Sequence, residues 1–357
     1  MKEAVLAHLK SASLALCFGL AACGGSSPDE TTETFATPAN AGVVNVYSAR
    51  HYDSDHALYE QFEAETGIRV NLLEGESEQL IQRLVNEAEF SPADILITVD
   101  AGRLFRAVEA DVFQPLDDEL LQSRVPDYVR DPNNLWYGFT KRARVIVYNK
   151  SEGAPEGLTT YEDLADPAYQ GEVCMRSSSN IYNISLLASI VERDGEEVAQ
   201  EWAEGVVENF ARPPQGNDTS ILQSIAAGEC GIGLANTYYI ARFAASDNPE
   251  LRAVYDNIGI IFPNQDGSGT HVNVSGGGLT QYAANRENAI ELLHFLTRED
   301  VQTAFSAGNN EYPVNLEAEL APQVSGLGEF REDDLQVTAL GTNQATAVRV
   351  FDRAGWR

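Results

Sequence analysis

The alternation of apolar and polar positions predicts a regular succession of strands and helices from residue 43 onward. A short apolar run typical of a buried strand is followed by a segment in which Leu58, Tyr59 and Phe62 share one helical face. The elements predicted up to residue 110 are strands over 43–47, 68–73 and 93–99 and helices over 54–65, 78–89 and 102–110. This β-α-β-α order predicts a mostly parallel sheet with helices on both faces, whose ligand sites lie beyond the carboxyl ends of the strands.

A second α/β set follows the long apolar strand Arg144–Tyr148. Its predicted elements are strands over 172–176 and 231–235 and helices over 183–193, 197–210, 218–227 and 238–245. A return strand over 271–274 precedes Gly276–Gly278, which we interpret as a hinge or close-packing turn, and a helix over 286–296. Two crossing strands between two lobes form a hinge that closes on a ligand.

The predicted division of the chain follows from these two crossings. Lobe 1 comprises residues 43–140 and 275–315, and lobe 2 comprises residues 141–274 and 316–357.

The first 42 residues have the pattern of an export signal and a tether. Lys2 and Lys10 accompany an apolar run that ends at Cys23, and the run is too short to span a bilayer permanently. The sequence Leu-Ala-Ala-Cys, with the cleavage point before its cysteine, is typical of a bacterial lipobox, although an ordinary signal peptide can also contain a cysteine. We predict a signal peptide over 1–22, a flexible Gly/Ser/Thr/Glu-rich tether over 23–42, and a periplasmic protein anchored to a membrane through lipid on Cys23.

Charge and cysteine content narrow the classes of partner and site. The chain has 24 Lys and Arg against 54 Asp and Glu, a net charge of −30, which repels nucleic acid and anionic lipid. Outside the N-terminal segment only Cys174 and Cys230 remain, and they are candidates for a disulfide in an oxidising compartment. The absence of a Cys-x-x-Cys motif argues against a zinc or iron–sulfur site.

Four tyrosines follow strand ends, where residues of a doubly wound lobe face the cleft: Tyr52, Tyr182, Tyr238 and Tyr239. One tyrosine at such a place is usually a packed or surface residue, so the hypothesis depends on all four together. Fe³⁺ is a hard cation that prefers anionic oxygen, and phenolate is a strongly basic oxygen donor. Because a free phenol has a pKa of about 10, binding must expel protons. His51 can supply a neutral nitrogen.

Two further features fit this site. Adjacent Tyr238 and Tyr239 can reach one ion from the first turn of a helix but not from a strand, and Asn236-Thr237 is a plausible N-cap pair. Basic residues lie near the same places in the sequence: Arg50, Lys141, Arg142, Arg176, Arg212 and Arg242. We expect Arg142 and Arg242 to lie next to the ligands without touching the ion and to lower the phenol pKa values. The alternative is that these arginines form ordinary ion pairs with carboxylates.

Four segments resemble the bacterial ferric-iron-binding periplasmic proteins of iron(III) ABC importers, with most similarity to the type that uses tyrosine and histidine without a synergistic anion. They are residues 44–52, 176–183, 235–239 and 308–313. The resemblance implies an α/β, two-lobe periplasmic-binding fold (type II, transferrin-like) with a two-strand hinge. It also implies Fe³⁺ as cargo, with Fe²⁺ as an alternative, ligated by the four tyrosines and His51. The implied partners are the permease subunits of the importer, and the implied state is a monomer.

Two other functions compete with this interpretation. A two-lobe receptor for an anion or small organic solute would use the arginines as primary ligands, with hydroxyls from Ser177–Ser179. A non-haem Fe(III) enzyme of the intradiol-dioxygenase type would also use tyrosine and histidine, but it keeps a coordination position open for substrate. Neither a nucleophile elbow nor a phosphate-loop signature is visible, so we expect a binding protein rather than an enzyme.

Overall fold

The computed structural model describes residues 42–357, so the predicted signal peptide, Cys23 and nearly all of the tether lie outside the described residues. The strands are β1 (Val43–Ser48), β2 (Arg69–Glu74), β3 (Ile95–Val99), β4 (Tyr137–Asn149), β5 (Val173–Cys174), β6 (Ile232–Asn236), β7 (Ile258–Ile261), β8 (Val272–Leu279) and β9 (Tyr312–Pro313). The helices before residue 230 are α1 (Asp53–Thr66), α2 (Ser77–Glu87), α3 (Ala101–Glu109), α4 (Glu119–Arg124), α5 (Ile181–Asp194), α6 (Glu196–Glu208) and α7 (Asp218–Ala226). The later helices are α8 (Thr237–Ala244), α9 (Pro249–Asn257), α10 (Arg286–Leu296), α11 (Glu299–Asn309), α12 (Pro322–Ser325), α13 (Thr338–Thr342) and α14 (Gln344–Ala354).

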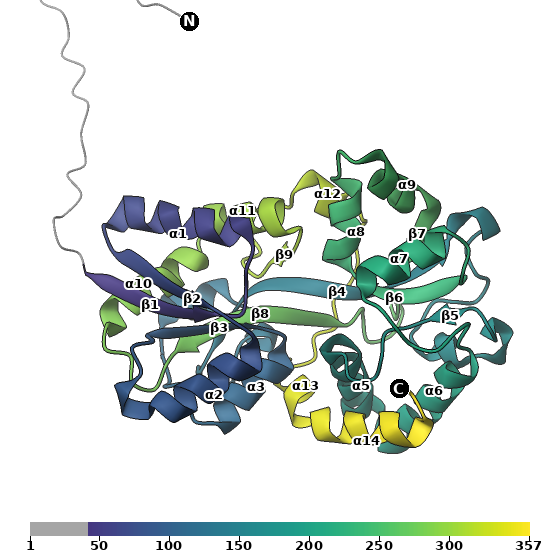
Figure 1. Ribbon diagram of the computed structural model, residues 1–357, viewed down its shortest axis with the longest axis horizontal. Helices are drawn as coiled ribbons and strands as arrows, with labels where there is room; N and C mark the ends of the chain where they lie inside the picture. Colours follow the sequence, from purple (N-terminus) through teal and green to yellow (C-terminus); the bar gives the residue numbers. More distant parts are fainter. Residues whose placement is uncertain (1–41) are drawn as a thin grey trace, which may run out of the picture. The chain divides into compact units, whose positions relative to one another are not determined.

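The sheet is mixed, with strand order β2-β1-β3-β8-β4-β6-β5 and β7 and β9 also paired to β4. Strand β1 runs parallel to β2 and β3, and β5 runs parallel to β6, whereas every pairing of β4 and β8 is antiparallel. The prediction of a mostly parallel sheet was therefore wrong. The chain leaves lobe 1 along β4 and returns along β8, so these two crossing strands must run in opposite directions (Figure 1).

Gly276–Gly278 were predicted to form a hinge or close-packing turn. They form no turn and lie inside β8 between β3 and β4, but close packing is confirmed. A Cβ at Gly276 would approach the Tyr137 carbonyl oxygen to 2.4 Å, and one at Gly277 would approach the Leu96 carbonyl oxygen to 2.4 Å. Glycine is required because neighbouring backbone passes too close to this strand for a side chain.

The buried cores follow the two lobes with two exceptions. One core is built from residues between Val44 and Phe139 and between Val274 and Val314, and two others come mainly from residues 143–272 and the C-terminal segment. Val337 and Leu340, predicted in lobe 2, pack into the first core instead. The reason is that α13 lies against both α3 and α5, so this segment packs on both lobes (Figure 1). Tyr312, predicted in lobe 1, packs into a lobe 2 core.

Cys174 and Cys230 are joined by a disulfide with their Cα atoms 6.0 Å apart. The bond fits the sheet, because Cys174 ends β5 and Cys230 lies two residues before the paired strand β6. Both cysteines are buried.

Removing this disulfide by Cys174→Ser with Cys230→Ser is expected to lower the free energy of unfolding by about 4 kcal/mol. The bond closes a loop with a sequence separation of 56 residues, which restricts the unfolded chain. Denaturant unfolding of the oxidised protein and the double variant measures the difference. A loss below about 1 kcal/mol would contradict this expectation.

Candidate metal centre in the interlobe cleft

A cavity of about 290 Å³ lies between residues of the two lobes. Lobe 1 contributes the segment after β1 and the end of α11, lobe 2 contributes the starts of α5 and α8, and β4 and β8 form the floor. Its lining includes His51, Tyr52, Arg142, Tyr182, Tyr238, Tyr239, Arg242, Ser275, Asn309, Asn310 and Glu311. All seven predicted iron-site residues therefore line one cavity.

Each tyrosine lies at the first turn of a helix that follows a strand or loop. Tyr52 is the N-cap residue of α1, Tyr182 is the second residue of α5, and Tyr238 and Tyr239 are the second and third residues of α8. The helix over 183–193 was predicted too short, because Asn180 caps α5 by accepting from the Tyr182 backbone N–H. Phenolates at these places lie near the positive ends of three helix dipoles.

The phenol groups of lobe 2 lie close to one another. The Tyr182 and Tyr238 hydroxyl oxygens are 3.1 Å apart, and the rings of Tyr238 and Tyr239 have centroids 4.3 Å apart. Adjacent residues can share the cleft because α8 begins at Thr237, as the sequence required. Asn236 occupies the N-cap position, but its side chain accepts from Arg144 instead of capping the helix. His51 stacks on Tyr52 and is exposed.

Burial controls the proton affinity of these phenols. It raises the pKa of Tyr52, and the nearby Glu311 carboxylate adds to this while Arg50 opposes it. Burial also raises the pKa of Tyr238 and of Tyr239, with a further contribution from repulsion by Tyr182 in both cases. Without a cation these three phenols therefore hold their protons at neutral pH. A highly charged cation must displace those protons to bind.

Arginines face the rings of three of these phenols. The Arg242 guanidinium lies 5.1 Å from the centre of the Tyr239 ring, and Arg50 lies 5.1 Å from the centre of the Tyr52 ring. Arg144 and Arg176 face the Tyr182 ring at 5.9 and 5.1 Å. Buried Arg142 donates to Ser275.

Two basic residues of the predicted group lie elsewhere. Lys141 pairs with Glu332, and Arg212 pairs with Glu229. Neither lines the cavity. Proximity to a tyrosine in the sequence therefore did not place these two residues at the site.

No individual role was predicted for Glu311 or Arg144. Glu311 is buried beside the cleft, where it accepts from the Arg50 guanidinium at 3.0 Å and from the Thr140 hydroxyl at 2.9 Å. The only sequence signal was the motif at residues 308–313. Its partner Arg50 is 261 positions away, a separation at which no local pattern links an arginine to a carboxylate.

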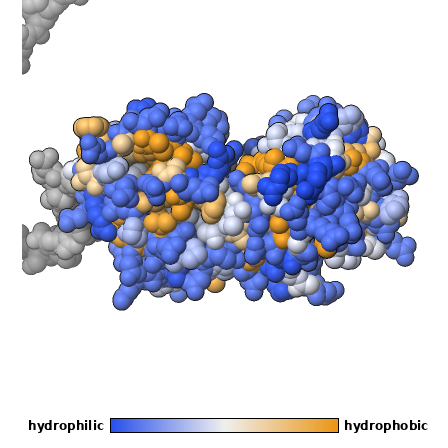
Figure 2. Space-filling model, turned by 90° about the horizontal axis from the view of Figure 1, so that it is seen from below, coloured by the Kyte–Doolittle hydropathy of each residue, from blue (hydrophilic) through white to orange (hydrophobic). Residues whose placement is uncertain are grey.

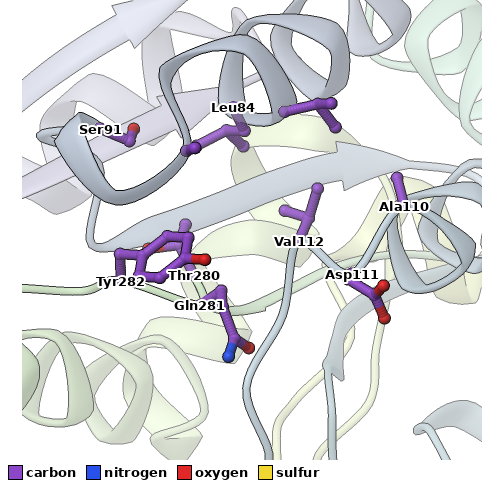
Figure 3. Close-up of a pocket in the computed structure, with 10 residues that line it drawn as sticks. Leu84, Ser91, Ala110, Asp111, Val112, Thr280, Gln281 and Tyr282 are labelled. Atoms are coloured by element: carbon purple, nitrogen blue, oxygen red, sulfur yellow. The ribbon is translucent and has the colours of Figure 1, made fainter.

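Four other hollows within residues 42–357 are each lined by at most one of these four tyrosines. Figure 3 shows one in lobe 1, lined by apolar side chains such as Leu84 and Val112, with Asp111 and the ring of Tyr282 at its edge. Within residues 42–357, no group of three or more His, Cys, Asp or Glu residues is placed to hold a metal ion. Phenol oxygens are therefore the donors that the described chain concentrates in one cavity.

The fold and the cleft define a two-lobe, type II periplasmic-binding protein of the transferrin-like kind, as expected from the sequence. The chain belongs to the bacterial extracellular solute-binding protein family, whose profile matches residues 57–332. No helix within residues 42–357 is long and apolar enough to cross a membrane. The surface in Figure 2 is mostly hydrophilic, with scattered apolar patches.

Similar proteins confirm the resemblance stated from the motifs. Iron uptake protein A1 of Synechocystis sp. is 48% identical over 338 residues, which cover 95% of this chain and 93% of that protein. A Trichodesmium IdiA (FutA) structure in complex with iron and citrate ligands has a TM-score of 0.86 and 50% identity, covering 88% of this chain and all of that one. Apo FutA2 from Synechocystis has a TM-score of 0.84 and 44% identity, covering 88% of this chain and 99% of that one.

Proposed function

We propose that the protein captures Fe³⁺ in the interlobe cleft through tyrosinates and delivers it to the permease of an ABC iron importer. The observation that carries this proposal is the convergence of four phenols from three helix starts on one cavity. The similarity to an iron uptake protein and to a structure with bound iron supports the same cargo. His51 is proposed as a further ligand at the exposed edge.

Charge balance favours the ferric ion. One Fe³⁺ and four phenolates carry a net charge of −1 (+3 − 4). Around the ion and its ligands, the positive charges of four arginines cancel the negative charges of four carboxylates. The arginines are Arg50, Arg142, Arg144 and Arg176, and the carboxylates are Asp55, Asp100, Asp218 and Glu311. In the described chain Arg242 pairs with no carboxylate, and its charge compensates the remaining −1. Fe²⁺ would leave −2, so one phenol would have to keep its proton.

The two lobes contribute unequally to the proposed mechanism. Tyr182, Tyr238 and Tyr239 belong to lobe 2 and form a preassembled set, while Tyr52 and His51 belong to lobe 1. Iron first binds to the lobe 2 phenols, and closure then adds Tyr52 and excludes water. Release follows when the permease separates the lobes, when phenolates are protonated, or when iron is reduced.

The N-terminal segment sets the proposed location of the protein. Lipid on Cys23 would hold the monomeric receptor at a periplasmic membrane surface, and the flexible tether would let the two lobes move away from that surface.

The proposed class is a receptor rather than an enzyme, because four phenols and His51 leave little coordination space for a substrate. Turnover of catechol by the iron-loaded protein would contradict this assignment.

The proposal is tested by a visible absorption titration of the purified protein with ferric citrate. A broad charge-transfer band that saturates at one iron per chain is expected for tyrosinate ligation. If no band and no retained iron are found, the ferric assignment fails. Anion binding that is lost in Arg142→Ala and retained in the tyrosine variants would then favour an anion receptor.

Replacing Arg242 with Gln is expected to lower the affinity for Fe³⁺ about tenfold, because the charge facing Tyr239 is removed while every ligand stays. Chelator competition followed at the charge-transfer band measures this. Arg252→Gln on α9 is the matched control, since Arg252 is exposed, lies outside the cleft and makes the same change in net charge. Equal affinities in the two variants would exclude the role given to Arg242.

A further inference from the structure

Asp100 adopts a backbone conformation that a residue with a side chain rarely takes. Its φ is +80° and its ψ is 125°, and the residue is completely buried at the N-cap of α3. Its carboxylate accepts from the Gly102 backbone N–H at 2.9 Å. Strained residues of this kind persist where the surroundings hold them firmly, and they cluster at functional sites.

The surroundings that hold Asp100 come from both lobes. The Ser185 hydroxyl, on α5 of lobe 2, donates to the carboxylate with separations of 2.9 and 3.0 Å to its two oxygens. The Asn273 side chain, on the crossing strand β8, donates to the same carboxylate at 2.8 Å and accepts from the Ala101 backbone N–H at 2.9 Å. A single buried carboxylate thus joins α3, β8 and α5.

This contact lies directly behind the cleft. Ser185 is three positions after Tyr182 on α5, so the two side chains lie on the same side of the helix. The Arg142 guanidinium, which lines the cavity, lies 4.0 Å from the Asp100 carboxylate. Helix α13 packs against both α3 and α5 next to the contact (Figure 1). The position of Tyr182 relative to lobe 1 therefore depends on how α5 is held against α3.

We infer that Asp100 is a positioning residue that holds the two lobes in the present orientation through its hydrogen bonds to Ser185, and that these bonds break when the lobes separate. Strands β4 and β8 connect the lobes covalently and persist in every orientation, whereas the Asp100–Ser185 contact can be made or lost. This inference about Asp100 deepens the proposed function. The consequence for iron release rests on that function. Asp100 does not touch the ion, and it acts through α5 and Arg142.

The variant that tests the inference is Ser185→Ala, with Ser189→Ala as control. Ser189 is also buried on α5, but its hydroxyl donates only to the Leu186 carbonyl of the same helix. Ser185→Ala is expected to release Fe³⁺ to a chelator about tenfold faster than wild type, because a hydrogen bond to a buried charge is lost. The wavelength of the charge-transfer band and the one-to-one stoichiometry should not change. Release at the rate of wild type and Ser189→Ala would overturn the inference.

A second measurement separates this inference from the proposed function. Small-angle X-ray scattering of the iron-free proteins is expected to give a larger radius of gyration for Ser185→Ala than for wild type and Ser189→Ala. If wild type shows no charge-transfer band, the proposed function fails, and the scattering comparison still decides whether Asp100 sets the lobe orientation. Identical radii of gyration in wild type, Ser185→Ala and Ser189→Ala would then refute the inference that Asp100 sets the lobe orientation. If Ser185→Ala does not fold, Asp100→Asn, which removes one of the accepting oxygens, replaces it in both comparisons with the same expected results.

Discussion

Replacing Tyr238 with Phe is expected to lower the affinity for Fe³⁺ by more than about a hundredfold, since loss of an outer-shell partner alone typically costs ten- to a hundredfold. Tyr238 is buried, and its hydroxyl lies 3.1 Å from that of Tyr182, at the centre of the lobe 2 phenols. The substitution removes one oxygen and leaves the ring that packs against Tyr239. The charge-transfer band should weaken and shift. Spectroscopic titration and chelator competition measure both effects.

The matched control is Tyr255→Phe, on α9 of the same lobe. It makes the same chemical change, and Tyr255 contacts Lys150 rather than the cleft. Wild-type affinity is expected there. A Tyr238→Phe protein that binds iron with the strength and spectrum of Tyr255→Phe would refute tyrosinate ligation by Tyr238.

Iron affinity is expected to fall by at least about three decades for each unit of pH lost below neutrality. Burial raises the pKa values of Tyr52, Tyr238 and Tyr239, so all three phenols are protonated in the iron-free protein at neutral pH. Each releases one proton when it binds the ion, and lower pH favours the protonated, iron-free form. The sign is therefore fixed: affinity rises with pH and falls with acid.

The measurement is the apparent binding constant between about pH 6 and 8 with a competing chelator whose own protonation is known. Direct counting of the protons released on binding provides an independent check. The Tyr238→Phe protein provides an internal comparison, because it should release one proton fewer than wild type. A slope near zero would mean that the ion binds without displacing phenol protons, which is incompatible with phenolate ligation.

Much of the local structure follows from short-range pattern. The start of α8 at Thr237 could be expected, because Tyr238 and Tyr239 need helical geometry to face one cleft. The strands and helices up to residue 110 were found within two residues at every boundary, because short apolar runs and helical periodicity mark these elements locally. The α/β class depends on this local order.

Other features depended on partners distant in sequence. The prediction of a mostly parallel sheet was wrong because β4 and β8 cross between the lobes in opposite directions. Gly276–Gly278 resemble a turn unless the flanking strands β3 and β4 are known. The place of Val337 and Leu340 in the lobe 1 core depends on the packing of α13 against both α3 and α5.

Residue type and spacing were enough to predict the class of fold, the candidate tyrosines and the chemistry they suit, because that information is local in the chain. The charges that surround these tyrosines became known only from the folded arrangement. Glu311 meets Arg50 across 261 positions, and Ser185 meets Asp100 across 85. Buried hydrogen bonds and ion pairs act over a few ångströms in space, regardless of separation along the chain. Their partners therefore become visible only when the lobes are folded.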